Sequence, residues 1–251
     1  MTPNALPDHA KSLRLAISLL TVLPVRIRGD QPLAGANRAM LWAPLLGLLL
    51  GAFAAGVMSL GTLSGQRSLL SAALGVAALA VLTRGLHLDG LADTADGLGT
   101  RRSPVDALAV MRAGDIGPFG VVSVVLVLLI QVAAAAQAGP LALMAAVTVG
   151  RIAMTWSCRR GVPAARPDGL GALVAGSVVP VHAALFGLVG LLAAVALGPT
   201  GALGVLAGLA AGDILLRRCL QRLGGVTGDV LGAVCEVAVT ASLVIFAATP
   251  G

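Results

Sequence analysis

Long uninterrupted apolar segments dominate this chain and leave few architectures open to it. Seven such runs cover approximately residues 40–63, 68–86, 117–137, 140–158, 178–197, 200–216 and 230–248. They approach the roughly 20 residues that a helix needs to cross the hydrocarbon core of a bilayer. They lack the alternation of apolar and polar residues that a strand of a membrane barrel requires. The sequence therefore predicts an all-α, polytopic integral membrane helix bundle with about seven spans.

The composition excludes the other broad classes of protein. Only 11% of the 251 residues are charged, whereas about a quarter are charged in a typical soluble domain. The 57% of apolar residues excludes a disordered chain. The three cysteines are odd in number and lack metal-ligand spacing, which indicates neither a disulfide framework nor a zinc site. We interpret residues 1–251 as a single transmembrane domain without a separate soluble domain.

The N-terminal apolar run, residues 15–25, is too short to cross a bilayer by itself. Basic residues precede it, so one alternative is a signal peptide that is cleaved near residues 34–36. A signal peptide is normally uncharged between its apolar run and its cleavage site. This stretch instead carries Arg26, Arg28 and Asp30. We expect a short interfacial or re-entrant helix that remains in the mature protein.

The basic residues are distributed unequally across the predicted spans. All of them fall on one side of the membrane except Arg67, on the other side, and Arg151, inside the run 140–158. Because cytoplasmic loops carry an excess of Lys and Arg, this side is predicted to face the cytoplasm, in the inner membrane. The net charge of +6 would suggest nucleic acid in a soluble protein. Here it sets orientation, and we expect the lipid bilayer, not nucleic acid, as a partner.

Carboxylates gather on the same side as the arginines, although orientation does not require them. Three of them, Asp89, Asp93 and Asp96, are spaced i, i+4 and i+7, which places them on one face of a helix. Three neighbouring carboxylates repel one another, and no Lys lies between them. Mg²⁺ held by carboxylates together with substrate phosphates is a common solution. The alternative is a solvated helix end just beyond a span.

A second acidic pair, Asp229 and Glu236, is spaced i, i+7 on one helical face. Glu236 is the only Glu of the chain and lies in an apolar run, where an ionisable group requires a cavity, a partner or a metal. The glycine-rich turn before the pair includes Thr227 and Gly228. Backbone N–H groups of such a turn can approach an anion, so both residues are candidates for substrate binding.

Two further polar residues have alternative interpretations. Arg151 either extends toward the boundary of its span or reaches into the bundle to pair with a carboxylate or a phosphate. His87 lies beside the three aspartates and is either a general base or an interfacial histidine. Asp213 is expected to pair with Arg217 one turn further along its helix.

Two segments carry a family resemblance. Residues 87–97 read HLDGLADTADG, and residues 227–233 read TGDVLGA, followed by Glu236. They are similar to the H-L-D-G-L-A-D-x-x-D-G and T-G-D-x-L-G-A-x-x-E motifs of the cobalamin synthase family (adenosylcobinamide-GDP ribazoletransferase). Residues 44–47 and Met111-Arg112, followed by Gly117 and Gly120, add weaker support. The chain resembles this family from Leu13 to about Leu243.

The resemblance implies a reaction. A hydroxyl of α-ribazole, or of its 5′-phosphate, would attack the cobinamide-linked phosphorus of adenosylcobinamide-GDP. GMP would leave, completing the nucleotide loop of the cobamide in cobalamin biosynthesis. Such phosphoryl transfer depends mainly on positioning and on charge stabilisation. A homo-oligomer or contacts with other cobalamin-biosynthesis enzymes remain open alternatives for protein partners.

The resemblance also implies roles for the polar residues. Arg112 and Arg151 would hold phosphate oxygens, and Thr227 and Gly228 would bind substrate. His87 or an aspartate, for which Asp93 is the candidate, would accept the hydroxyl proton. One or two Mg²⁺ ions on the diphosphate would be held by the five predicted metal ligands, Asp89, Asp93, Asp96, Asp229 and Glu236.

Two other functions remain as alternatives. A CDP-alcohol phosphotransferase also uses membrane aspartates, but its D-G-x-x-A-R pattern requires Arg where Asp93 follows Ala92. A cation-coupled transporter would place acidic residues near the middle of the bilayer in paired, broken helices. The carboxylates of this chain cluster at one surface instead.

Overall fold

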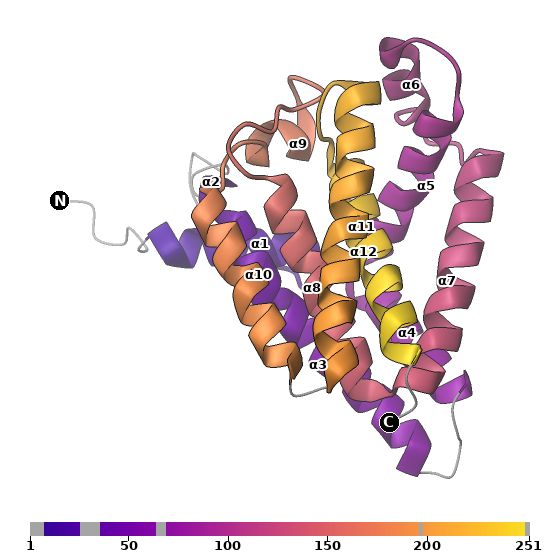
Figure 1. The fold of residues 1–251 in the computed structure, drawn as a ribbon. Helices are drawn as coiled ribbons and strands as arrows, with labels where there is room; N and C mark the ends of the chain where they lie inside the picture. The colour runs from indigo at the N-terminus through magenta and orange to yellow at the C-terminus, as the bar shows by residue number, and fades with distance from the viewer. Residues whose placement is uncertain (1–7, 26–35, 64–68, 196–197, 249–251) are drawn as a thin grey trace.

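A computed structural model describes residues 8–25, 36–63, 69–195 and 198–248 of the chain. These residues form an all-helical bundle and contain no β-strand. Five long helices run along the bundle: α3 (Ala43–Leu63), α7 (Pro118–Ala138), α8 (Pro140–Ser157), α11 (Pro199–Leu223) and α12 (Gly228–Ala247). α8 packs against the other four, and Figure 1 shows it between them. The predicted fold class, an all-α bundle with apolar helices long enough to cross a membrane, is confirmed.

Proline and glycine set the beginnings and ends of these helices. Gly139 has a φ of 86°, which ends α7, and Pro140 begins α8. Gly198 has a φ of 82°, and Pro199 begins α11 in the same way. Proline is favoured at the first helical position because its fixed φ suits the helix and its missing N–H is not needed there. Both tight turns join antiparallel neighbours, one between α7 and α8 and one before α11.

Fewer helices than the seven predicted spans have the length and hydropathy of a membrane span among the described residues. Within the described residues, four helices are long and apolar enough to cross a membrane, or five if the bent pair α4–α5 is counted as one span. α4 (Leu69–Leu82) has 14 residues and α10 (Pro180–Ala194) has 15. At 1.5 Å per residue they are about 21 and 22.5 Å long, shorter than the roughly 30 Å hydrocarbon core. The prediction of seven spans is therefore not confirmed.

A sharp bend separates α4 from α5 (Leu86–Gly99), and the two helices meet at 87°. The backbone turns through Arg84 and Gly85, whose φ values are 55° and 68°. Glycine adopts this left-handed conformation without steric cost, whereas arginine does so rarely. The run predicted at 68–86 is thus α4, and the three aspartates that follow it belong to a separate helix.

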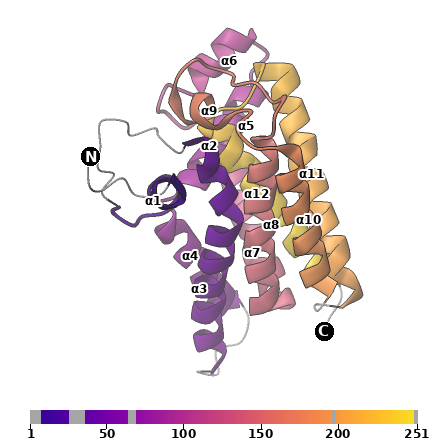
Figure 2. The ribbon, with the colours of Figure 1, turned by 90° about the vertical axis from the view of Figure 1, so that its left-hand side faces the viewer.

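The N-terminal helix α1 (Asp8–Leu20) lies across the bundle. Figure 2 views α1 nearly along its axis, whereas α3 runs vertically beside it. The indole Nε1 of Trp42, at the end of the short helix η1 (Met40–Trp42), donates a hydrogen bond to Ser12 Oγ over 3.2 Å. This orientation fits the predicted interfacial helix. The charged residues of the cleavage argument (Arg26, Arg28, Asp30) and Arg67 lie outside the described residues, as do Ala34 and Gly35 of the alternative cleavage site.

One end of the bundle carries the remaining short helices. α6 (Pro104–Val110) and α9 (Gly169–Val174) lie at the upper end in Figure 1, where α6 packs against α11 and α9 packs against α12. α2 (Ala36–Ala39) reaches the same end and packs against α9. α5 rises toward this end and packs against α7 and α12. The two motif segments, residues 87–97 and 227–236, are thereby brought together.

Candidate functional site

Two motif glycines bring α5 and α12 into backbone contact. A Cβ at Gly90 would lie 2.6 Å from the carbonyl oxygen of Asp229 and 2.8 Å from its Cα. A Cβ at Gly232 would lie 3.1 Å from the Cα of His87. Small residues allow this close approach between membrane helices. The glycines of both motifs therefore position the two helices against each other.

This crossing gathers three of the predicted carboxylates. Asp89 is exposed, while Asp93 and Asp229 are half-buried. The charges of Asp89 and Asp229 both act electrostatically on the carboxyl group of Asp93. Asp229 also accepts a hydrogen bond from Thr227 Oγ1 over 3.1 Å. Asp89, Asp93 and Asp229, called the acidic cluster below, form a region where like charges face one another.

Asp96 is used differently from the acidic cluster. It is 7% exposed, and its two carboxylate oxygens accept hydrogen bonds from the backbone N–H groups of Gly117 (2.7 Å) and Gly120 (3.0 Å). These groups belong to the start of α7, where the helix dipole also favours a negative charge. Asp96 therefore joins the end of α5 to the beginning of α7.

A cavity of about 320 Å³ lies beside Asp229, at the same end of the bundle. The segment between α8 and α9 forms one wall, because Ala165 N donates to Val226 O over 3.0 Å and Val226 N donates to Pro163 O over 2.9 Å. This pairing places Arg166 in the lining together with Thr227 and Gly228. The cavity thus combines two carboxylates, Asp168 and Asp229, with two arginines and the beginning of a helix.

Arg166 is held firmly at this wall. Its Nη2 donates to the carbonyl of Leu108 in α6 over 2.7 Å, and its buried Nε has no hydrogen-bond partner among the described residues. Burial lowers the pKa of this guanidinium, and the negative charge of Asp229 opposes that shift. Arg112 lines the same cavity and pairs with Asp168. Arg112 and Arg166 are the two cations that a phosphate in this cavity would meet.

Thr227 is the N-cap of α12, since its hydroxyl accepts a hydrogen bond from Val230 N over 3.2 Å. Threonine at this position satisfies one of the free N–H groups of the first turn. A Cβ at the neighbouring Gly228 would touch only the side chain of Leu170, at 3.4 Å. The turn therefore has a structural role besides its place in the cavity lining.

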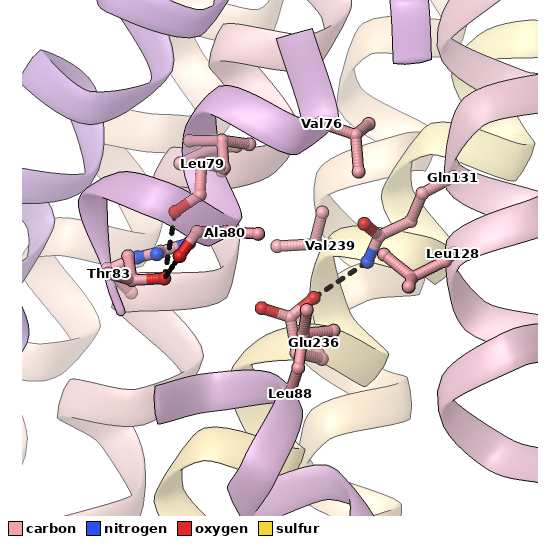
Figure 3. Close-up of a pocket in the computed structure, with 11 residues that line it drawn as sticks. Val76, Leu79, Ala80, Thr83, Leu88, Leu128, Gln131, Glu236 and Val239 are labelled. Atoms are coloured by element: carbon pink, nitrogen blue, oxygen red, sulfur yellow. Dashed lines mark hydrogen bonds between the residues drawn. The ribbon is translucent and has the colours of Figure 1, made fainter. Parts of the chain in front are cut away.

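Glu236 lies deeper in the bundle than the acidic cluster. It is seven residues after Asp229 on α12, which corresponds to about 10 Å along the helix axis. Its Oε2 accepts a hydrogen bond from Gln131 Nε2 of α7 over 2.8 Å, as Figure 3 shows. The same amide nitrogen donates to Thr240 over 3.0 Å. Glu236 and Gln131 line a cavity of about 20 Å³, whose other lining residues are mainly apolar.

Arg151 and His87 belong to this interior region. Arg151 is 3% exposed, lines the small cavity with Glu236 and interacts electrostatically with that carboxylate. Its aliphatic stem packs at Gly47 of α3, where a Cβ would lie 3.0 Å from the Cβ of Arg151. His87 is 4% exposed, and its buried Nδ1 has no hydrogen-bond partner in the described part of the chain.

Apart from Asp96, which binds the start of α7, the predicted site residues fall into two regions. The structure brings together Asp89, Asp93, Asp229, Thr227, Gly228 and Arg112 at one end, and His87, Arg151 and Glu236 inside the bundle. Across the described residues, no group of three or more His, Cys, Asp or Glu is arranged to hold a metal ion by itself. Sequence reasoning missed Arg166 and Asp168, although Arg166-Pro167-Asp168-Gly169 is a recognisable turn sequence.

The sequence was also compared with known families. A family profile described as cobalamin-5-phosphate synthase matches residues 12–247. The chain belongs to the cobalamin-5-phosphate synthase family. Its two motif segments are the ones that α5 and α12 bring into contact. Membership favours neither the CDP-alcohol phosphotransferase nor the transporter alternative.

Curated relatives in this family match over nearly their whole length. A protein of Frankia casuarinae is 44% identical, with 94% of each chain covered. One of a Nocardioides species is 45% identical, with 94% of this chain and 97% of the relative covered. One of Bradyrhizobium diazoefficiens is 40% identical over 88% of this chain. All three are named adenosylcobinamide-GDP ribazoletransferase. No solved structure matches the chain.

Proposed function

We propose that this membrane protein is an adenosylcobinamide-GDP ribazoletransferase. It joins α-ribazole, or its 5′-phosphate, to adenosylcobinamide-GDP and releases GMP in cobalamin biosynthesis. The observation that carries this proposal is the identity of 44–45% to relatives of that name over 94% of the chain. The contact between α5 and α12 supports it, because both motifs of the family supply the carboxylates of the acidic cluster.

The donor set fits a magnesium ion that binds together with substrate. Mg²⁺ is usually held by one or two carboxylates plus phosphate oxygens and water. Asp89, Asp93 and Asp229 would hold it, and it would neutralise the diphosphate in the transition state. Because no three such side chains among the described residues are arranged to hold a metal ion by themselves, phosphate oxygens of the substrate would have to complete the coordination. Asp96, with both oxygens on α7, and Glu236, deeper in the bundle, fit this role less well.

The remaining steps use the arginines of the cavity and a carboxylate of the acidic cluster. Arg112 and Arg166 bind the phosphate oxygens and orient the phosphorus toward the incoming hydroxyl. As the new O–P bond forms, the hydroxyl loses its proton and the bond to the GMP oxygen breaks. We assign acceptance of that proton to Asp93, which is half-buried beside Asp229. His87 is a second candidate, although its Nδ1 is buried.

The orientation follows from the distribution of charge. The end of the bundle with α6, α9 and the cavity carries most of the arginines, so we place it in the cytoplasm of a cell with an inner membrane. The predicted seven crossings would require α4–α5 to act as one bent span, with α10 and α11 spanning as well. A homo-oligomer and contacts with other cobalamin-biosynthesis enzymes remain predictions.

One assay tests the reaction and the metal together. The purified protein in lipid vesicles receives adenosylcobinamide-GDP and α-ribazole, and GMP release is measured with Mg²⁺ or with excess EDTA. We expect GMP release only with Mg²⁺. Asp93→Asn should lower the rate at least about 100-fold, since a carboxylate at the reacting centre is removed. No GMP from folded protein with Mg²⁺ would exclude the reaction, and full release in EDTA would exclude the metal.

The matched control is Asp106→Asn. Asp106 lies at the same end of the bundle in α6, is exposed, and contacts Ser103 instead of the acidic cluster. It should keep the wild-type rate. If Asp93→Asn and Asp106→Asn behave alike, the acidic cluster does not carry the reaction.

A further inference from the structure

A second, apolar hollow lies away from the acidic cluster, among α8, α10 and α11. Its volume is about 300 Å³, and its walls include Ile152, Trp156, Gly187 and Leu209. Figure 1 shows α10 and α11 joined at their lower ends and diverging toward the end that carries α9. Leu188 and Leu206 in the lining are 49% and 51% exposed, so the hollow opens onto the outer face of the bundle.

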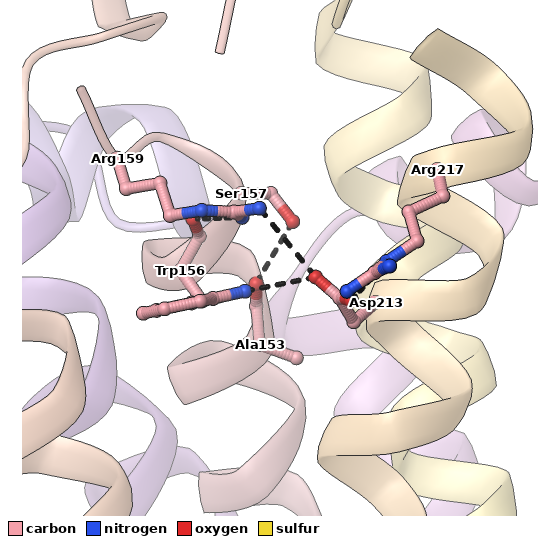
Figure 4. Close-up of polar contacts among 6 residues, drawn as sticks. All are labelled: Ala153, Trp156, Ser157, Arg159, Asp213 and Arg217. Atoms are coloured by element: carbon pink, nitrogen blue, oxygen red, sulfur yellow. Dashed lines mark hydrogen bonds and ion pairs between the residues drawn. The ribbon is translucent and has the colours of Figure 1, made fainter. Parts of the chain in front are cut away.

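Charged side chains cover the upper end of this hollow. The ring of Trp156 lines it, while the indole Nε1 donates to Asp213 Oδ1 of α11 over 2.9 Å. The guanidinium of Arg159 lies 4.3 Å from the centre of that ring and 3.6 Å from the Asp213 carboxylate. Arg217 Nε donates to Asp213 Oδ2 over 2.6 Å. Figure 4 shows both arginines converging on Asp213 above Trp156, so that one carboxylate faces two cations.

The surplus of positive charge extends beyond this group. Arg160 and Arg218 are exposed neighbours of Arg159 and Arg217 in the chain. Trp156 lies next to the end of α8, at the level where the arginine-rich end begins, and tryptophan is enriched at membrane–water interfaces. A ligand at this place would meet apolar walls on the membrane side and, at the interface, a net positive charge, because Asp213 is the one carboxylate among the described residues that pairs with Arg159 and Arg217.

We propose that this hollow binds an anionic phospholipid of the surrounding leaflet, with an acyl chain between α10 and α11 and its phosphate at Arg159 and Arg217. Charge complementarity selects an anionic headgroup over a zwitterionic one. The opening toward the outer face of the bundle selects a ligand that arrives from the membrane. The site shares no lining residue with the cavity beside Asp229, so it does not depend on the proposed reaction.

Native mass spectrometry of the full-length, detergent-solubilised protein tests this proposal. Phosphatidylglycerol and phosphatidylcholine with the same acyl chains are titrated separately. Each arginine near the interface contributes about fivefold in affinity for an anionic lipid. We therefore expect at least fivefold tighter binding of phosphatidylglycerol. Arg159→Gln should reduce this binding about fivefold, whereas the exposed Arg101→Gln in the α5–α6 connection should not change it.

A second pair of variants tests the acyl-chain part. A Cβ at Gly187 would meet only Leu209 Cδ1, at 3.7 Å, so Gly187→Leu fills the hollow without a backbone clash. Gly56→Leu is the control, because Gly56 on α3 is exposed and its Cβ would meet nothing within 4 Å. Gly187→Leu should weaken binding of phosphatidylglycerol at least tenfold, and Gly56→Leu should not. Equal binding of the two lipids, or equal effects of the two leucines, would overturn the proposal.

Discussion

The backbone contact between α5 and α12 offers a way to disturb the acidic cluster without removing any of its charges. Gly90→Ala adds one methyl group at the crossing. That carbon would lie 2.6 Å from the carbonyl oxygen of Asp229, whereas ordinary contact begins at 3.4 Å. Because the nearest atoms are backbone, they cannot rotate away. The two helices must therefore separate by about 0.8 Å, the difference between these two distances.

The expected effect on activity is larger than the effect on stability. A displacement of about 1 Å between catalytic groups lowers a rate by up to about 100-fold. Overpacking costs about 1–3 kcal/mol, and replacing glycine by alanine in a helix returns about 1 kcal/mol. We expect Gly90→Ala to lower the rate of GMP release 10- to 100-fold. Its free energy of unfolding should fall by no more than about 2 kcal/mol.

Gly56→Ala is the matched control, since it changes the same residue type in a membrane helix where the new Cβ meets no atom within 4 Å. The assay is GMP release in vesicles, combined with thermal unfolding in detergent. Wild-type activity in folded Gly90→Ala would refute the view that this crossing positions the carboxylates. An equal loss of activity in Gly56→Ala would refute it as well.

Three further substitutions test single contacts. Asp96→Ala removes the acceptor of two N–H groups at the start of α7 and should lower the free energy of unfolding by about 2–3 kcal/mol. Asp96→Asn keeps an acceptor oxygen and should lose less stability. An unchanged melting temperature of Asp96→Ala would contradict the anchoring role. Gln131→Leu removes the donor to Glu236 and should lower the free energy of unfolding by about 1–3 kcal/mol. Gln137→Leu, at an exposed position of α7, is its control. Equal melting temperatures of the two variants would contradict the importance of the buried contact. Arg166→Gln should raise the KM for adenosylcobinamide-GDP about 10- to 100-fold, because a charge-assisted hydrogen bond to phosphate is lost. Arg160, exposed on the same segment, provides the control, and Arg160→Gln should leave KM unchanged. An unchanged KM in Arg166→Gln would remove that residue from the phosphate site.

The long helices could be predicted well from uninterrupted apolar runs and from proline and glycine. Pro140 and Pro199 begin α8 and α11 where the turns were expected. The span count was harder to predict, because composition does not reveal that the chain bends at Arg84 and Gly85. An apolar run that continues into a polar helix gives the same local signal whether the helix is straight or bent by 87°.

The candidate site was predictable in part. Helical spacing correctly placed Asp89 and Asp93 near each other, but it treated Asp96 as equivalent to them. The hydrogen bonds of Asp96 depend on α7, which begins about 20 residues later in the chain. No local sequence pattern encodes the position of α7 relative to Asp96. Spacing likewise paired Asp229 with Glu236, although two turns of helix separate them in depth. Depth along a helix determines which neighbouring elements a side chain meets.

The contact between α5 and α12 also bears on how the protein is made. Ribosomes synthesise α5 long before α12, and domains of a growing chain fold in that order. Asp89 and Asp93 are therefore synthesised while Arg166 and Asp229 are still untranslated. The acidic cluster is therefore completed only when the last helix of the described chain inserts. A nascent protein arrested before residue 228 would contain all the described helices that precede α12. It would still lack one of the two helices that form the α5–α12 contact.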